Sequence, residues 1–115
     1  MKAVKFTIPL ADINTGNEIK TDIRLLNSET NRNEIPQDLL IINDTGAEIG
    51  LIYLDGDYEE VWRTNHPDWY DFTPIEAGRK LGSLPSSIHY VIFKRLTVDV
   101  ATEDLIFYGL NYQEV

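Results

Sequence analysis

The sequence predicts a mainly β domain with one or two short helices, and three observations lead to this prediction. Short apolar segments rich in Val, Ile and aromatic residues recur along the chain, and several alternate with polar residues. Turn-forming combinations of Gly, Pro, Asn and Asp separate these segments. Only two segments carry signals for the start of a helix. We therefore expect about six or seven strands in an all-β fold.

The first part of the chain predicts a β-hairpin followed by a loop. Apolar and polar residues alternate over residues 4–8 and again over residues 19–25, on either side of the turn-rich residues 14–17. Residues 27–38 are polar and contain Pro36, which has no N–H for a central strand ladder. We expect this segment to be an exposed loop, and a binding role for it stays open.

Two apolar segments, residues 39–42 and residues 49–53, are expected to form the central strands. Their β-branched residues favour strands that are buried on both faces. Residues 44–47 have the sequence Asp-Thr-Gly-Ala and form a small polar connection between the two strands. Aspartate is depleted in sheets and costly to bury as an anion, so this connection is the first candidate site.

Signals for helices occur in the middle of the chain. Residues 55–65 place apolar residues at helical spacing behind two aspartates that can cap a helix. Residues 73–82 begin with Thr-Pro-Ile-Glu, which fits a capping box with proline at the first helical position, but Gly78 lies in the middle of this segment. A helix and a β-turn region are equally compatible with the second segment.

The last part of the chain carries the strongest strand pattern. It covers residues 87–100, and its alternation extends through Val98 and Val100. A final apolar run, residues 105–108, is closed by Gly109. We expect one strand from each of these two segments.

Composition limits the classes of function. The 115 residues are expected to form one domain, residues 1–115. The net charge of −9 repels phosphate backbones and anionic lipids, so neither nucleic acid nor a membrane is an expected partner. The chain has no cysteine and only two widely spaced histidines, so no disulfide and no metal site is expected. Because no apolar segment has the length of a signal peptide core or a membrane span, we expect a soluble, cytoplasmic protein.

Two segments resemble the retroviral-type (retropepsin-like) aspartic proteases. Residues 39–53 hold an apolar strand, Asp-Thr-Gly-Ala and a second apolar strand. Residues 104–113 are similar to the apolar-apolar-Gly-x-Asn/Asp element of that family, with Gly109 and Asn111 at its two polar positions. The resemblance implies a single-lobe, acid-protease-like closed barrel. In it, the strand that ends at Gly109 enters a helix packed beside the active-site loop.

The resemblance also implies a role for each residue of the connection. Asp44 is the expected catalytic carboxylate, and Thr45 supplies the hydroxyl that locks two active-site loops together across a dimer axis. Gly46 lets backbone and substrate approach because it has no side chain. Ala47 is a small residue that faces the cleft.

A single Asp-Thr-Gly motif implies a homodimer with one Asp44 from each subunit. Two carboxylates about 3 Å apart share one proton, so one acts as a base toward water and the other as an acid toward the peptide carbonyl. The implied enzyme is an aspartic endopeptidase that needs no cofactor. It cleaves an extended peptide or polyprotein at mildly acid pH under a flap, for which residues 77–87 are the best candidate, and an ordinary surface loop is the alternative for this segment.

The sequence departs from the family at two places. Asn43 stands where the family usually has an apolar residue, so its amide is expected either to form hydrogen bonds within the loop or to distort it. The chain ends at Val115, soon after the expected helix begins. Either the N-terminal hairpin forms the dimer contact, the dimer forms differently, or the sequence is a fragment of a longer chain.

Two other interpretations stay open. One is a catalytically inactive, retropepsin-like dimeric module that binds peptides or serves in assembly. The other is an unrelated β-sandwich or barrel in which Asp44 begins an ordinary turn and Gly46 supplies a positive φ. This last interpretation predicts that Asp44 faces solvent and has no partner.

Overall fold

The computed structural model describes residues 3–54, 72–84 and 88–114, and these residues confirm the mainly β character that the sequence predicts. They form eleven strands and one short helix, and every ladder between strands is antiparallel. The elements in chain order are β1 (Ala3–Ile8), α1 (Leu10–Ile13), β2 (Ile19–Asp22), β3 (Leu25–Asn27), β4 (Arg32–Ile35), β5 (Asp38–Asn43), β6 (Ile49–Leu54), β7 (Thr73–Ile75), β8 (Gly78–Ser83), β9 (Tyr90–Arg95), β10 (Leu105–Leu110) and β11 (Gln113–Glu114).

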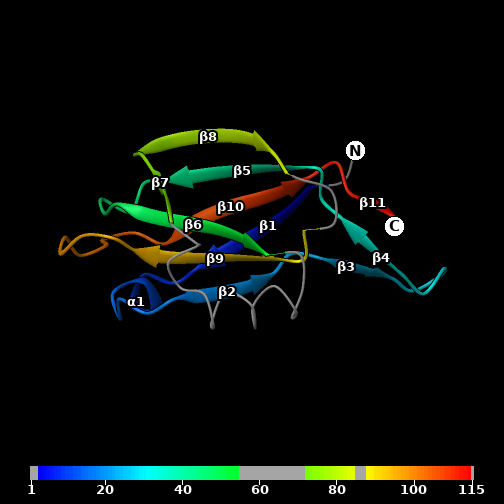
Figure 1. Cartoon of the computed structure of the whole chain (residues 1–115), viewed down its shortest axis with the longest axis horizontal. Coiled ribbons are helices and arrows are strands. Elements are labelled where there is room, and N and C mark those ends of the chain that lie inside the picture. The colour runs from blue at the N-terminus through cyan, green and yellow to red at the C-terminus, as the bar shows by residue number, and fades with distance from the viewer. Residues whose placement is uncertain (1–2, 55–71, 85–87, 115) are drawn as a thin grey trace.

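The strands form three open sheets (Figure 1). Two sheets have four strands, in the orders β1-β10-β5-β8 and β2-β9-β6-β7, and a smaller sheet has the order β11-β4-β3. The closed barrel that the resemblance implies is therefore not formed by the described residues. The reason is that β5 and β6, which are consecutive in sequence, do not pair with each other. The chain passes from one sheet to the other through residues 44–48.

The hydrophobic core lies between the two four-stranded sheets. Phe107 of β10 and Phe93 of β9 are fully buried, and their ring centroids are 5.0 Å apart across the interface between the sheets. Burial alternates along β5, so only one face of this strand is covered, whereas β6 is buried on both faces. The second face of β6 is covered by a small cluster around Leu54 and Ile92. The prediction of two doubly buried strands is thus confirmed for β6 and wrong for β5.

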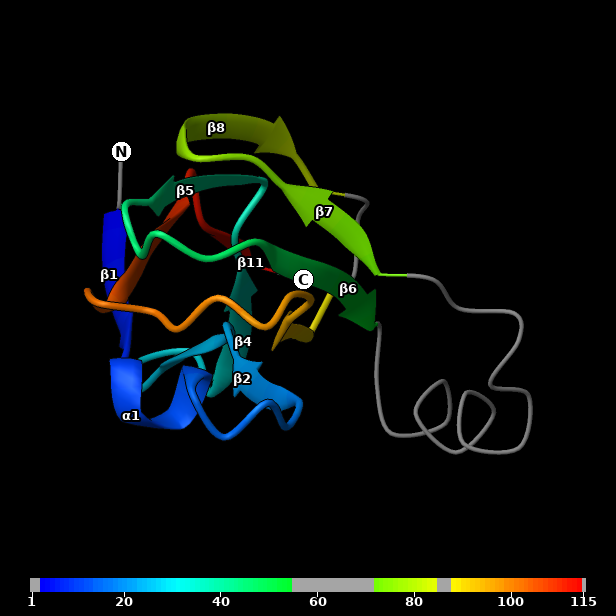
Figure 2. The same ribbon diagram turned by 90° about the vertical axis from the view of Figure 1, so that its left-hand side faces the viewer.

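The predicted N-terminal hairpin is wrong, although both of its strands exist. The strand β1 pairs with β10 in one sheet, and β2 pairs with β9 in the other. Between them, the short helix α1 takes the chain from one sheet to the next, as Figure 2 shows. Sequence alternation predicts a strand but does not specify its partner, because the backbone groups of any strand can pair with any other.

Residues 27–38, predicted as a loop, contain the second strand of a β-hairpin. The strands β3 and β4 pair from Leu25↔Glu34 to Asn27↔Arg32. The turn between them is held by Asn27, whose side-chain oxygen accepts a hydrogen bond of 3.0 Å from the Glu29 backbone N–H. Polar residues dominate this segment because both of its strands lie in a small, exposed sheet.

Residues 73–82 form strands, so the helical alternative is wrong for this segment. The strand β7 pairs with β6, and β8 pairs with β5 over its whole length. Gly78 has a φ of +102°, which lies outside the helical region and turns the chain from one strand to the other. The helix predicted for residues 55–65 lies outside the described residues.

The last two predictions hold only in part. The strand β9 ends at Arg95, and residues 96–104 continue as irregular backbone instead of extending the alternation to Val100. The apolar run near the C-terminus forms β10, as predicted. The helix expected after Gly109 is not formed: Asn111, at φ +56°, turns the chain into β11. No helix within the described ranges combines the length and apolar character required to cross a bilayer.

Candidate active site

The loop of residues 44–48 is held by a buried network on both sides of Asp44. Asn43, 1% exposed, donates hydrogen bonds through its side-chain nitrogen to the Ile75 carbonyl (3.1 Å) and the Ala47 carbonyl (3.2 Å). The hydroxyl of Thr45, 0% exposed, donates a hydrogen bond of 2.6 Å to the Asn43 side-chain oxygen. That hydroxyl also accepts a hydrogen bond from the Ala47 backbone N–H (3.1 Å). Asn43 therefore stabilises the loop and ties it to β7.

Thr45 lies inside the loop in the single chain. Its hydroxyl is fully buried and, within the described residues, forms hydrogen bonds only with Asn43 and Ala47. The contact across a dimer axis that the resemblance implies stays a prediction. The Thr45 carbonyl accepts a hydrogen bond of 2.9 Å from the Thr102 backbone N–H. Thr45 thus joins the loop to residues 96–104 of the same chain.

Asp44 is exposed between these two buried residues. The turn that follows it depends on Gly46, whose φ is +80°. A β-carbon at Gly46 would lie 3.6 Å from the Thr102 hydroxyl, which is ordinary van der Waals contact. Glycine is needed here for its backbone conformation and not for close packing. In a single chain, this geometry is expected both for an ordinary turn and for one half of a dimeric site.

A groove of about 510 Å³ lies directly beside the loop. One wall is formed by residues 46–48, and the other by residues 74–77 at the end of β7 and the turn that follows it. Ala47 and Ile75 form a buried floor, and Pro74 and Ala77 supply exposed apolar surface beside it. Glu48 and Glu76 are exposed at the two walls. We call this feature the loop groove. Its volume is within the range of about 300–1,000 Å³ that is common for ligand sites.

Exposed apolar residues lie in a segment that is hydrogen-bonded to the loop. Val98 and Val100 are 93% and 62% exposed, and both belong to the segment that Thr102 joins to Thr45. Asn14, just after α1, also holds this segment. Its side-chain nitrogen donates a hydrogen bond to the Ala101 carbonyl, and its side-chain oxygen accepts one from the Ala101 backbone N–H. One end of the molecule brings together four segments: the loop 44–48, the turn after β7, the segment 96–104 and α1 (Figures 1 and 2).

The structure does not bring Gly109 and Asn111 to this end. Gly109 pairs with Leu39, five residues before Asp44, at the opposite end of β5. At about 3.3 Å per residue, that separation is roughly 17 Å along the strand. Asn111 donates a hydrogen bond of 2.6 Å to the Asp38 carboxylate and so joins the ends of β10 and β5. The strands of the two segments that carry the resemblance are therefore neighbours, but the Asp-Thr-Gly turn and residues 109–111 lie at opposite ends of this strand pair.

The flap expected at residues 77–87 is not a free hairpin in the described part of the chain. Residues 78–83 form β8, which pairs with β5 from Gly78↔Asn43 to Ser83↔Asp38. This strand is the last of its sheet, and Leu81 on it is 67% exposed. Residues 85–87 lie outside the described residues.

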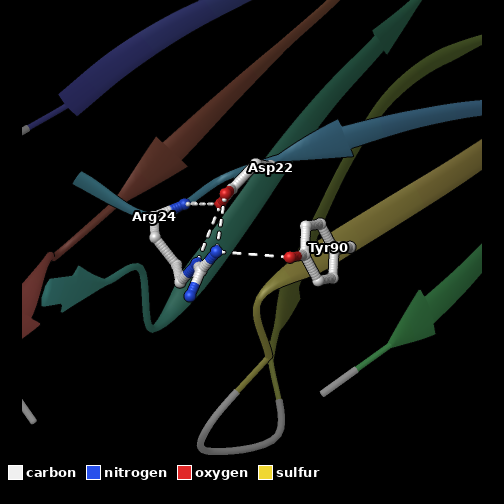
Figure 3. Close-up of polar contacts among 3 residues, drawn as sticks. All are labelled: Asp22, Arg24 and Tyr90. Atoms are coloured by element: carbon white, nitrogen blue, oxygen red, sulfur yellow. Dashed lines mark hydrogen bonds and ion pairs between the residues drawn. The ribbon is translucent and has the colours of Figure 1, made fainter. Parts of the chain in front are cut away.

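A second polar cluster, not predicted from the sequence, lies at the end of β2 and the start of β9 (Figure 3). Arg24 donates two side-chain hydrogen bonds to the Asp22 carboxylate (2.8 and 3.0 Å) and one of 3.3 Å to the Tyr90 hydroxyl. Burial acts to raise the pKa of Asp22, but the hydrogen bonds and charge of Arg24 outweigh it and hold this pKa below its usual value. Because the carboxylate already neutralises Arg24, the cluster fits a structural ion pair.

The described residues contain no group of three or more His, Asp and Glu side chains that could hold a metal ion. Comparison of the chain with protein-family models, curated proteins and solved structures found no match.

Proposed function

We propose that the chain is an aspartic endopeptidase that acts as a homodimer, with one Asp44 from each subunit in the catalytic pair. The observation that carries the proposal is the position of Asp44. Its carboxylate is exposed, its two neighbours are buried and hydrogen-bonded, and the loop groove begins two residues further on. Because Asn43 and Thr45 fix the backbone on both sides, Asp44 keeps its position when a second copy approaches.

The chemistry requires two carboxylates that share one proton. The ionised Asp44 takes a proton from a water molecule, whose oxygen attacks the carbonyl carbon of the peptide. The partner subunit's Asp44 donates its proton to the carbonyl oxygen. The carbon–nitrogen bond of the resulting tetrahedral species then breaks, and the amine leaves with a proton from the pair.

The exposed apolar surface beside the loop supports the dimer. A two-fold axis near Asp44 places the adjoining residues 96–100 in or near the contact between subunits. Val98 and Val100 would then lose most of their exposed apolar area, which favours association.

A second candidate function is a peptide-binding or assembly module without catalysis. The pairing of β8 with β5 favours it, because a strand fixed in a sheet cannot close over a substrate as a free hairpin does. A site that stays open to water lacks the low-dielectric surroundings that strengthen acid–base catalysis.

Cleavage of a peptide library distinguishes these candidates. Wild type, Asp44→Asn and the control Glu29→Gln are incubated with the library from about pH 4 to about pH 7, and products are identified by mass spectrometry. Asp44 and Glu29 are both exposed, so both variants are expected to fold, and Glu29 lies in the turn of the small separate sheet. We expect the Asp44→Asn variant to lose at least about a hundredfold in rate and the Glu29→Gln variant to match wild type.

Sedimentation equilibrium in the same buffers supplies the oligomeric state. A dimeric wild type that binds peptides without cleaving them would favour the second candidate. Equal cleavage by wild type and by the Asp44→Asn variant would exclude Asp44 as the catalytic group. A wild type that is monomeric at all concentrations and neither binds nor cleaves would support the ordinary turn.

A further inference from the structure

We propose that the loop groove binds an extended peptide segment through one basic side chain, Lys or Arg, flanked by small apolar residues. The proposal rests on the proposed function for the nature of the occupant, a peptide. It adds the class of side chain that the groove selects. Three features of the described residues carry it: the floor of the groove, the charges on its walls and the charges of the neighbouring hollow.

The floor favours small apolar groups. Pro74 and Ala77 line the groove and are exposed, so a side chain that enters the groove meets apolar surface. The floor is fixed in place at Ala47 and Ile75, because the Asn43 side chain donates hydrogen bonds to the carbonyls of both residues. A preformed apolar floor binds an aliphatic stem without first having to be ordered.

The walls favour a positive charge. Glu48 and Glu76 come from different segments and are the ionisable residues that line the groove. Both are exposed, and neither forms an ion pair or a side-chain hydrogen bond with any residue in the described ranges. The side chain of lysine or arginine combines an aliphatic stem with a terminal cation, which matches an apolar floor between two carboxylates.

Within the described residues, the cations at the end of β9 form no ion pair with these carboxylates. Arg95 pairs with Ile49 in the sheet, next to Glu48, but its guanidinium donates a hydrogen bond to the Asn14 side chain (3.3 Å). The ammonium group of Lys94 lies 5.8 Å from the centre of the Phe72 ring. The charge of the whole chain, −9, also favours a basic partner over an acidic one.

A second hollow limits how many basic residues the segment can carry. It has a volume of about 310 Å³, shares Pro74, Glu76 and Ala77 with the loop groove, and is also lined by Arg79 and Lys80. A run of several basic residues would bring like charges together there. We therefore expect a preference for one basic residue and against a polybasic segment.

Binding of three matched peptides tests the proposal. Each is a blocked, fluorescently labelled heptapeptide of alternating Val and Ala with Lys, norleucine or Glu at its centre. Affinities are measured by fluorescence anisotropy with wild type and with Asp44→Asn, in which cleavage cannot deplete the peptide. We expect the Lys peptide to bind on the order of tenfold more tightly than the Glu peptide, with norleucine between them, and this ratio to shrink in high salt.

Variants of the walls identify the groove as the binding site. The double variant Glu48→Gln/Glu76→Gln should lose the preference for Lys and still bind the norleucine peptide. The matched control Glu103→Gln, an exposed carboxylate outside the groove, should keep the preference. A preference that survives in the double variant, equal affinity for the Lys and Glu peptides, or no binding of any peptide would overturn the proposal.

The same peptides separate this proposal from the proposed function. Selective binding of the Lys peptide by wild type without cleavage defeats the endopeptidase and leaves the binding proposal intact. Cleavage of all three peptides at equal efficiency would defeat the selectivity and leave the endopeptidase. Far-ultraviolet circular dichroism of each variant confirms that the sheets are retained.

Discussion

The Thr45 hydroxyl donates a hydrogen bond of 2.6 Å to the side-chain oxygen of Asn43, and both side chains are buried on either side of the exposed Asp44. The departure from the family at Asn43 therefore has a structural reason, and of the two alternatives expected for it, hydrogen bonding within the loop is the one observed. An apolar residue at position 43 could not donate to the Ala47 and Ile75 carbonyls.

Replacing Asn43 by alanine is expected to destabilise the fold by about 2–4 kcal/mol. The change removes the side-chain donor of the buried Ile75 and Ala47 carbonyls and the Asn43 oxygen that accepts from Thr45, which leaves the Thr45 hydroxyl only the Ala47 carbonyl at 3.2 Å. Urea unfolding followed by circular dichroism measures the free energy of unfolding. Asn33→Ala, at an exposed position of β4, serves as the control and should change it by no more than about 0.5 kcal/mol. Equal effects of the two substitutions would show that the network contributes little.

Charges at the apolar surface beside the loop are expected to weaken dimer formation. In Val98→Asp/Val100→Asp, a contact through residues 96–100 would have to bury two carboxylates, so we expect at least about a tenfold rise in the dissociation constant. Leu26→Asp is the matched control, because Leu26 is similarly exposed on β3, in the small separate sheet. Sedimentation equilibrium over a range of concentrations compares the three proteins. A dimer that resists the double change but dissociates in the control would place the contact elsewhere.

Tyr112 is expected to make stability fall at alkaline pH. Burial, with a further contribution from the charge of Glu34, raises the pKa of Tyr112 to about 12, whereas an unfolded tyrosine has a pKa of about 10. The folded state therefore disfavours the phenolate. The contribution of the neutral Tyr112 side chain to the free energy of unfolding is complete below about pH 10 and is lost as the pH rises toward about 12.

Tyr112→Phe tests this dependence. At neutral pH the change removes the hydrogen bond of 3.0 Å that the Tyr112 hydroxyl donates to the Ile23 carbonyl, so we expect a loss of about 0.5–1.5 kcal/mol. Between about pH 10 and about pH 12 the variant should lose less stability than wild type, in urea unfolding at a series of pH values. Burial also raises the pKa of Tyr53, so part of the alkaline loss should remain in the variant. Parallel pH profiles for the two proteins would contradict the assignment to Tyr112.

Local sequence patterns predicted the strands and the turn at the candidate site. The strands β5, β6 and β10 lie on the predicted apolar runs, and continuous apolarity indicated burial on both faces correctly for β6 but not for β5. The positive φ at Gly46 was also predictable, because Asp-Thr-Gly is a turn sequence and only glycine adopts that conformation without strain. The network around Asn43 was foreseen only as one of two alternatives, since the carbonyl of Ile75 lies far away in the sequence.

The pairing of strands was decided by tertiary structure. Backbone hydrogen bonds do not depend on side-chain identity, so the sequence of a strand does not state whether its neighbour is the next strand or a distant one. For that reason β1 lies beside β10, the sheets stay open, and Gly109 lies far along β5 from Asp44. By itself, the sequence determined where β1, β5, β6, β10 and the Asp-Thr-Gly turn occur, because these depend on neighbouring residues. Only the tertiary structure decided that Asp44 is exposed beside a groove with two exposed carboxylates on its walls, because that arrangement depends on which segments the packing of the two sheets brings together.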